Sequence, residues 1–128
     1  EKIIRQEMQA IGAQELLLPV LGPRSLWEKT GRWKGYEPPL FKVKDIHGRF
    51  FCLSPTHEEV VTELARKKIH SYKDLPKVVF QIQDKFRNEL RSSGGLLRTR
   101  EFLMKDMYSF HANEKESLQF YQKVKEAY

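Results

Sequence analysis

Apolar residues recur at the spacing of an α-helix in three segments, residues 1–11, 56–69 and 113–128. Residues 56–59 (T-x-x-E) and 113–116 (N-x-x-E) fit a capping box, in which two side chains bond backbone N–H groups at a helix start. Each is therefore expected to begin a helix. The residues expected to form the buried faces are Ile3, Ile4, Met8 and Ile11, then Val60, Val61 and Leu64, and last Leu118, Tyr121 and Val124.

Between these helices the pattern favours strands. Residues 14–18 form a short apolar run that ends at Pro19, as a strand stopped by proline would. Residues 22–39 are rich in Gly and Pro and are expected to form a loop with one short helical turn. Two strand pairs are predicted, one near 41–45 and 49–54 and a longer one at 78–89 and 98–110. This order predicts an α+β domain with a mixed, mainly antiparallel sheet flanked by helices.

Composition and charge narrow the class of protein. The chain has 128 residues, of which 40% are hydrophobic and 31% charged, as in an ordinary globular domain. No apolar run approaches the roughly 18 residues that a membrane span needs, so no membrane partner is expected. The single cysteine, Cys52, stands in the apolar stretch FFCLS, which favours a reduced core thiol and a cytosolic or organellar location, of which the cytoplasmic one is expected. A net charge of +6 suits a polyanionic partner such as a nucleotide or nucleic acid.

Alternation along the two long strands separates their faces. The first carries Phe80, Ile82 and Phe86 on one face, and a polar row on the other that must meet either bulk water or a polar ligand. The second mixes aromatic, thioether and charged groups on one face, which suits a small-molecule site. These two rows are Gln81, Gln83, Lys85, Arg87 and Glu89, and Arg100, Phe102, Met104, Asp106 and Tyr108. A solvated basic hairpin and a phosphate-binding pocket are both compatible with them, and Arg91 and Arg98 beside the Ser-Ser-Gly-Gly loop favour the pocket.

Two stretches around that loop resemble motif 2 of class II aminoacyl-tRNA synthetases. They are Phe86-Arg87-Asn88-Glu89 and Arg98-Thr99-Arg100-Glu101-Phe102, within residues 80–110. Residues 1–19 are similar to motif 1, which forms much of the dimer interface in that class. The segments LWEKTGRW, SPTHEE, QIQDKFRNE and GLLRTREFLMKDMYSFH resemble prolyl-tRNA synthetases of the bacterial type, in the same order and over nearly the whole chain.

The resemblance implies an ATP site and gives its residues roles. Arg87, the expected catalytic residue, would contact the α-phosphate of ATP and the carboxylate of proline. Glu89 would meet the adenine amino group and Phe102 would stack on the base. Arg98 would reach the outer phosphates, and Thr99 is assigned to the same site. The resemblance also implies Mg²⁺ on the phosphates.

The resemblance further implies a proline pocket and a tRNA partner. Thr56 and Glu58 would hold the secondary ammonium of proline, beside Arg87, with Met104 and Tyr108 on the apolar side. A helix cap explains Thr56 without any ligand, and core packing would explain Met104 and Tyr108. The four histidines stand in separate predicted elements, and no Cys/His spacing suggests zinc. The implied partners are ATP, L-proline, the proline tRNA and a second copy of the chain bound through motif 1.

The sequence departs from the family pattern in two ways. Its motif 2 loop reads RSSGGLLR, where the family has an arginine and a bulkier residue, which puts contacts with the tRNA acceptor end in doubt. The third class II motif, G-x-G-x-x-R, does not occur, and neither an editing nor an anticodon-binding domain is expected. Residues 1–128 are thus interpreted as the N-terminal part of a catalytic domain that activates proline and transfers it to tRNA. A non-catalytic module that binds tRNA or a protein partner is the alternative.

Overall fold

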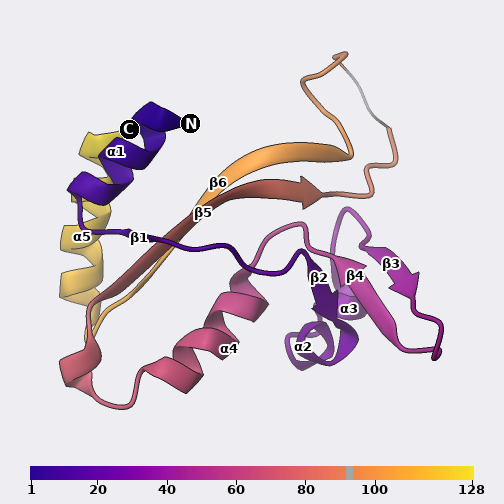
Figure 1. The fold of residues 1–128 in the computed structure, drawn as a ribbon, viewed down its shortest axis with the longest axis horizontal. Helices are drawn as coiled ribbons and strands as arrows, with labels where there is room; N and C mark the ends of the chain where they lie inside the picture. The colour runs from indigo at the N-terminus through magenta and orange to yellow at the C-terminus, as the bar shows by residue number, and fades with distance from the viewer. Residues whose placement is uncertain (92–93) are drawn as a thin grey trace. The chain divides into compact units, whose positions relative to one another are not determined.

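A computed structural model describes residues 1–91 and 94–128 as two compact units (Figure 1). The first unit consists of residues 1–17, 62–82 and 105–128, and the second of residues 18–61 and 83–104. Half of the predicted Ser-Ser-Gly-Gly loop, residues 92–93, lies outside the described residues. Within the described part of the chain, no helix is long and apolar enough to cross a membrane.

The first unit combines helices with a three-stranded sheet in the order β1-β5-β6. β1 pairs with β5 in parallel, with Gln14 opposite Val79. The strands β5 and β6 run side by side and contribute their remaining residues to the second unit (Figure 1). The elements are α1 (Lys2–Ala10), β1 (Gln14–Glu15), α4 (Glu58–Lys68, in this unit from Thr62), the 3₁₀ helix η1 (Tyr72–Asp74), β5 (Lys77–Phe86), β6 (Glu101–Phe110) and α5 (Glu114–Ala127). The predicted helices and the α+β class are confirmed, although β1 is shorter than expected. The predicted buried face of α1 is wrong in part, because Met8 is buried but Ile3 and Ile4 are exposed.

The core of the first unit is built around Phe80, which is fully buried together with Met8, Ala13 and Val78. Phe120 of α5 packs against this cluster. The predicted buried face of α5 is therefore wrong in part: Leu118 and Tyr121 are exposed, while Phe120, Val124 and Ala127 are more sheltered. The reason is geometric, because an i, i+4, i+7 spacing keeps side chains in a narrower stripe than repeated steps of three.

The cap expected at the start of α5 is present. The side-chain oxygen of Asn113 accepts a hydrogen bond from the Glu116 N–H at 3.0 Å, and the Asn113 amide donates to the Glu116 carboxylate at 2.9 Å. The first of these bonds satisfies one of the backbone donors that a helix start leaves unpaired.

The second unit contains an antiparallel sheet in the order β2-β4-β3, in which Cys52 of the central strand lies opposite both Gly22 and Lys42. Its elements are β2 (Leu21–Pro23), α2 (Arg24–Lys29), α3 (Arg32–Gly35), β3 (Phe41–Lys44) and β4 (Phe50–Leu53). The predicted 41–54 hairpin is confirmed. The one helical turn predicted within residues 22–39 is present as α2, but the rest of the segment is not an open loop, because it also holds β2 and α3.

Two tryptophans explain why residues 22–39 form regular elements. Trp27 is fully buried and Trp33 nearly so, and both pack with Leu40 and Cys52 in a hydrophobic core cluster. Gly22 has no side chain at the point of closest approach: an added Cβ would lie 2.8 Å from the Trp27 indole nitrogen. The Gly-Pro content of the segment therefore reflects a tight packing of β2 on α2 rather than an open loop.

The buried Cys52 thiol gives a prediction about pH. Its burial is the main cause that raises its pKa from 9.0 to about 12. Below pH 9 the thiol is protonated in both the folded and the unfolded chain, so it does not affect stability there. Between pH 9 and 12 only the unfolded chain loses the proton, so the free energy of unfolding falls as pH rises through this window.

We expect Cys52→Ala to remove this part of the pH dependence, which urea unfolding at pH 8 and pH 10.5 would measure. In the native chain Cys52 should also resist iodoacetamide at pH 8 and react only in urea, because the thiolate is the reactive form. Rapid labelling of the native chain at pH 8 would contradict the burial.

Candidate functional site

The sequence predicted that the Arg87-x-Glu89 segment lies within the first long strand. In the structure it instead follows β5, which ends at Phe86. It is held as a turn by three hydrogen bonds. The Arg87 N–H donates to the Arg100 carbonyl at 2.9 Å, and the Glu89 N–H donates to the Arg87 carbonyl at 2.7 Å. The Arg100 side chain returns a bond from Nε to the Glu89 carbonyl at 3.0 Å. Arg100 therefore fixes the backbone that presents the other two side chains.

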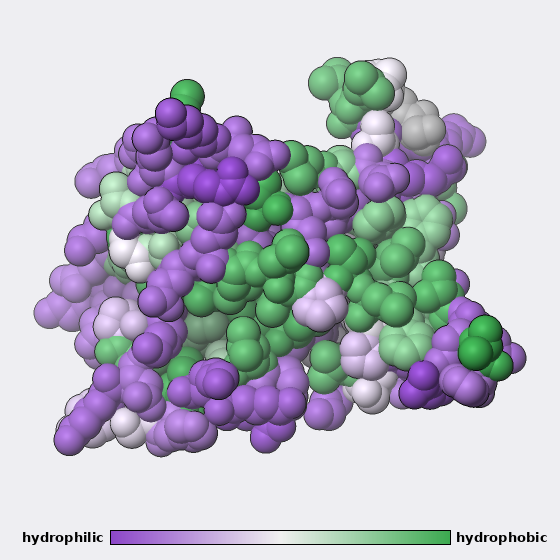
Figure 2. Space-filling view, in the orientation of Figure 1, coloured by the Kyte–Doolittle hydropathy of each residue, from purple (hydrophilic) through white to green (hydrophobic). Residues whose placement is uncertain are grey.

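A cavity of about 370 Å³ brings together all five residues that were predicted to bind ATP. It is lined by Arg87, Glu89, Leu96, Leu97, Arg98, Thr99 and Phe102. The two leucines are 93% exposed, and Figure 2 shows hydrophobic side chains gathered at the tip of the loop between β5 and β6. The cavity thus combines apolar walls with a few charged groups, as small-molecule sites do.

The charged groups of this cavity are arranged in a definite way. The Arg98 guanidinium donates to Glu89 Oε2 from Nη2 at 2.8 Å and from Nε at 3.1 Å. The Arg87 guanidinium lies over the Phe102 ring, 5.2 Å from its centroid. Within residues 1–91 and 94–128, the buried Arg87 Nε has no hydrogen-bond partner. Glu89 is nearly buried, whereas Arg98 remains 61% exposed, so Arg98 is the partner that solvent reaches more easily.

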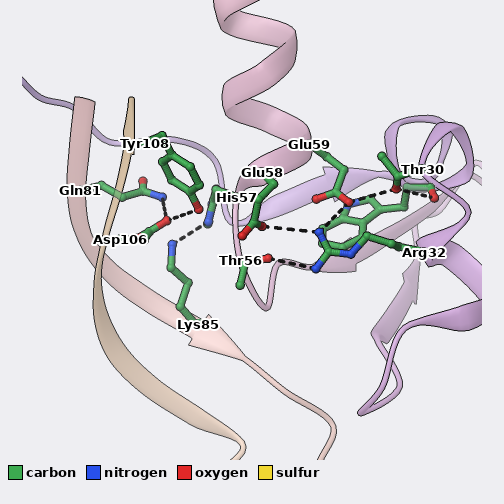
Figure 3. A network of polar contacts seen from close by, with 11 residues as sticks. Thr30, Arg32, Thr56, His57, Glu58, Glu59, Gln81, Lys85, Asp106 and Tyr108 are labelled. Carbon is green, nitrogen blue, oxygen red and sulfur yellow. Dashed lines mark hydrogen bonds and ion pairs between the residues drawn. The ribbon is translucent and has the colours of Figure 1, made fainter. Parts of the chain in front are cut away.

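A second cluster contains the two residues predicted to bind an amine, Thr56 and Glu58. Both side chains point toward Arg32, which sequence reasoning did not single out (Figure 3). Arg32 Nη2 lies 3.4 Å from Thr56 Oγ1, and Arg32 Nη1 lies 3.5 Å from Glu58 Oε2. The Glu58 side chain is 51% exposed and so can be reached by a ligand.

The predicted capping box at Thr56 and Glu59 is wrong. Helix α4 begins at Glu58, and the Glu59 carboxylate is turned to Arg32 Nη1 at 3.0 Å and to the Thr30 hydroxyl at 3.0 Å. The Glu59 side chain is 1% exposed, and a buried carboxylate binds a guanidinium in preference to a neutral N–H. Thr56 is consequently released from the capping role that competed with a role in binding.

Aromatic rings hold Arg32 from its faces. Its guanidinium carbon lies 4.4 Å from the centroid of the Tyr36 ring and 5.4 Å from that of Trp27. Burial by itself would lower the pKa of Arg32, but the charge of Glu59, followed by smaller effects of Tyr36 and Glu58, raises the pKa above its ordinary value. Arg32 is therefore a permanent, oriented cation. The only signal in the sequence was its place in the segment LWEKTGRW, which had carried the family resemblance but no site.

A buried polar pair supports the loop between Thr56 and Glu58. The His57 ring and the Lys85 side chain are fully buried, with Lys85 Nζ 2.6 Å from His57 Nδ1 (Figure 3). His57 Nε2 lies 3.1 Å from the Pro19 carbonyl, which can only accept, so Nε2 carries the proton and Nδ1 accepts from Lys85. The strand pattern predicted that Lys85 meets either bulk water or a polar ligand. In the structure its side chain instead contacts His57 in the interior of the second unit.

The remaining predicted residues are placed differently. Met104 is half-buried on β6 in the second unit. Tyr108 belongs to the first unit, where its hydroxyl donates to the Asp106 carboxylate at 2.6 Å. The amide of buried Gln81 donates to the same carboxylate at 3.1 Å, so Gln81 also does not face water. Across the described ranges there is no group of three or more His, Cys, Asp or Glu side chains suited to a metal ion.

Comparisons with known proteins place these features in context. Residues 41–128 match the family described as the tRNA synthetase class II core domain (G, H, P, S and T). Over its whole length the chain is 53% identical to proline–tRNA ligase of Acidithiobacillus ferrooxidans and 56% identical to that of Persephonella marina. It covers 22% of the first and 23% of the second, and so spans less than a quarter of the length of these curated relatives.

Solved structures give the same picture of the fold. A prolyl-tRNA synthetase from Giardia lamblia in complex with prolyl-adenylate matches with a TM-score of 0.90 at 25% identity, over 98% of this chain and 26% of that chain. A prolyl-tRNA synthetase from Cryptosporidium parvum, complexed with L-proline and AMP, matches with a TM-score of 0.81 at 22% identity, over 96% of this chain and 25% of that one. The predicted class II fold is thereby confirmed.

Proposed function

Because the chain belongs to the class II tRNA synthetase core domain family, we propose that it forms the N-terminal part of the catalytic domain of a prolyl-tRNA synthetase. This enzyme would use ATP to convert L-proline to prolyl-adenylate and would then transfer proline to its tRNA. One observation carries the proposal: a single cavity gathers Arg87, Glu89, Arg98, Thr99 and Phe102. Relatives more than 50% identical over the whole chain and named proline–tRNA ligase support the choice of amino acid.

In the proposed reaction a carboxylate oxygen of proline attacks the α-phosphorus of ATP, and pyrophosphate leaves with the bonding electron pair. Negative charge builds on the non-bridging α-phosphate oxygens as this happens. Arg87 is suited to meet it, because its planar fork is half-buried and the turn held by Arg100 fixes its backbone. Little proton transfer is needed, so positioning and charge account for most of the rate.

ATP binding would exchange the partners of the Glu89–Arg98 pair. Arg98 would turn to the outer phosphates and Glu89 would accept from the adenine amino group, while Phe102 stacks on the base. The exchange is possible because Arg98 is largely exposed and because ATP would supply a new partner to each side chain. The pair therefore keeps Glu89 oriented until the nucleotide arrives.

For proline, we assign the secondary ammonium to Glu58 and Thr56 and the carboxylate to Arg87. Glu58 supplies the exposed negative charge and Thr56 a hydroxyl whose orientation Arg32 fixes. Met104, half-buried in the same unit, remains part of the proposal as the apolar wall. The prolyl-adenylate bound by the Giardia lamblia relative supports this pairing of an amine site with a nucleotide site.

Mg²⁺ enters the proposal with the phosphates of ATP, whose charge it would neutralise. The described residues bring together no set of three or more metal-binding side chains, so no residue of this chain is assigned to the ion. Such an arrangement is common, because Mg²⁺ in nucleotide sites is held largely by phosphates and water with one or two carboxylates.

The proposed partners follow from charge and exposed apolar surface. A net charge of +6 suits the tRNA backbone. Ile3 on α1 and Leu17 after β1 are each 74% exposed, which supports contact with a second copy through the motif 1 region. A role in charging tRNA also favours a cytoplasmic location.

The proposal is tested by aminoacylation with the full-length synthetase that would carry this chain. Purified proline tRNA is incubated with ATP and radiolabelled proline, alanine or threonine, and acid-precipitable label is measured. We expect label with proline and at most a small fraction of it with the other two. Tight tRNA binding without charging by any amino acid would instead support a non-catalytic module.

A further inference from the structure

Arg32 lies between two carboxylates that differ sharply in their surroundings. Arg32 Nη1 is 3.0 Å from Glu59 Oε1, and the Glu59 side chain is 1% exposed. The same nitrogen is 3.5 Å from Glu58 Oε2, but Glu58 is 51% exposed. Coulomb attraction is stronger where water is excluded and where the distance is shorter, so Arg32 is held mainly by Glu59.

The position of Arg32 is fixed by further contacts that do not involve Glu58. The Tyr36 ring lies 4.4 Å from the guanidinium carbon, and the Thr30 hydroxyl shares Glu59 Oε1. The Arg32 side chain is 29% exposed. It therefore cannot swing freely to Glu58 without leaving both its buried partner and a flat aromatic neighbour.

Counting charge in this cluster gives a simple result. Arg32 contributes one positive charge, and Glu58 and Glu59 contribute two negative ones, so one negative charge remains. It resides on Glu58, because Glu59 is the carboxylate that compensates Arg32. A single exposed negative charge is what one ammonium group complements.

We infer that Glu59, by holding Arg32, determines how strongly the Thr56–Glu58 site attracts the amine of the substrate. Glu59 is a positioning residue in this account, since it is buried and acts through Arg32. Arg32 has a second effect in the same direction, because its Nη2 contact orients the Thr56 hydroxyl. The inference rests on the proposed function, in which Thr56 and Glu58 bind the ammonium of proline.

The test is Glu59→Gln in the full-length synthetase, a change that keeps the shape of the side chain and removes its charge. Arg32 would then be left with Glu58 as its only carboxylate in this cluster, and the cluster would become neutral. We expect the KM for proline to rise about tenfold, equivalent to about 1.4 kcal/mol. The KM for ATP should change less than about twofold by the same relation between affinity and free energy. Steady-state pyrophosphate exchange at varied proline and ATP gives both values.

A double variant separates charge from structure. Glu59→Gln combined with Arg32→Gln restores one negative charge on Glu58, so the KM for proline should return toward that of the unaltered protein. A purely structural role predicts the opposite, because the double variant has lost more contacts than the single one. The double variant also decides the matter if the single variant fails to fold, since it no longer contains a guanidinium that has lost its buried carboxylate. Glu63→Gln, on the same helix and paired with Arg66, is the matched control.

The possible results are distinct. A raised proline KM that the double variant reverses supports the inference. An unchanged proline KM in Glu59→Gln, an equal rise in the KM for ATP, or a double variant worse than the single one would overturn it. If the unaltered protein shows no exchange with proline at all, the proposed function fails first, and the inference with it.

Discussion

Replacing Arg87 with alanine is expected to lower the rate of prolyl-adenylate formation by about 10²–10³-fold, the effect typical of losing one preorganised group that faces developing charge. Arg87→Lys should lower it by at least about tenfold, because lysine keeps the charge but loses the fork that can meet two oxygens at once. The residue is half-buried, and within the described chain its Nε atom lacks a partner, so the guanidinium is not already engaged at that atom. Both variants would be measured by single-turnover adenylate formation in the full-length synthetase.

Arg49→Lys provides the matched control for that pair. Arg49 lies in the same unit, is 68% exposed and pairs with Asp45 in the turn between β3 and β4. The rate of adenylate formation by the Arg49→Lys variant should equal that of the unaltered protein, because exposed ion pairs contribute little. A near-normal rate in Arg87→Lys would show that Arg87 does not act on the α-phosphate.

The second large effect concerns stability. Phe80→Ala is expected to lower the free energy of unfolding by about 3–5 kcal/mol, because it empties the middle of a core and leaves a cavity. Phe80 is fully buried and packs with Met8, Ala13 and Val78. Urea unfolding of the 128-residue chain, followed by far-ultraviolet circular dichroism, measures the change.

Leu118→Ala on α5 is the control for the core, since Leu118 is 57% exposed. It should change the free energy of unfolding by less than about 0.5 kcal/mol, as surface substitutions usually do. If Leu118→Ala proved as destabilising as Phe80→Ala, the packing face of α5 would be the one predicted from sequence rather than the one seen.

Regular elements, and the gathering of the five expected ATP-site residues around one cavity, could be predicted from sequence because their signals are local. The apolar spacing of residues 1–11 and the Asn113 cap each depend on neighbours within a few positions, and both are present in the structure. Arg87 and Glu89 stand two positions apart, and their relation to Arg98 across one loop followed from the family motif. To predict the cavity that these residues line, it was therefore enough to assume that the two strand ends lie next to each other.

Two of the errors arose where a distant residue decided the outcome. Glu59 fitted a capping box, but Arg32, 27 positions away, binds its carboxylate. Lys85 had the alternation of a solvent-facing residue, yet it is buried against His57, 28 positions away. A spacing rule cannot see such a partner, because it describes one element at a time.

These long-range contacts converge on the stretch 56–59. Arg32 contacts Thr56, Glu58 and Glu59, while Lys85 contacts His57 between them. Every residue of the stretch is thus contacted by a basic side chain from another part of the second unit. Such external support is what a site needs if its side chains must keep one geometry in the absence of ligand.

Proline-dependent exchange of radiolabelled pyrophosphate into ATP by the full-length synthetase tests the central claim most directly, with threonine and serine as controls. The account predicts exchange with proline alone, since only its secondary ammonium and compact ring are assigned to Glu58 and the apolar wall. A folded protein that binds ATP yet shows no exchange with any amino acid, or equal exchange with all three, would contradict it.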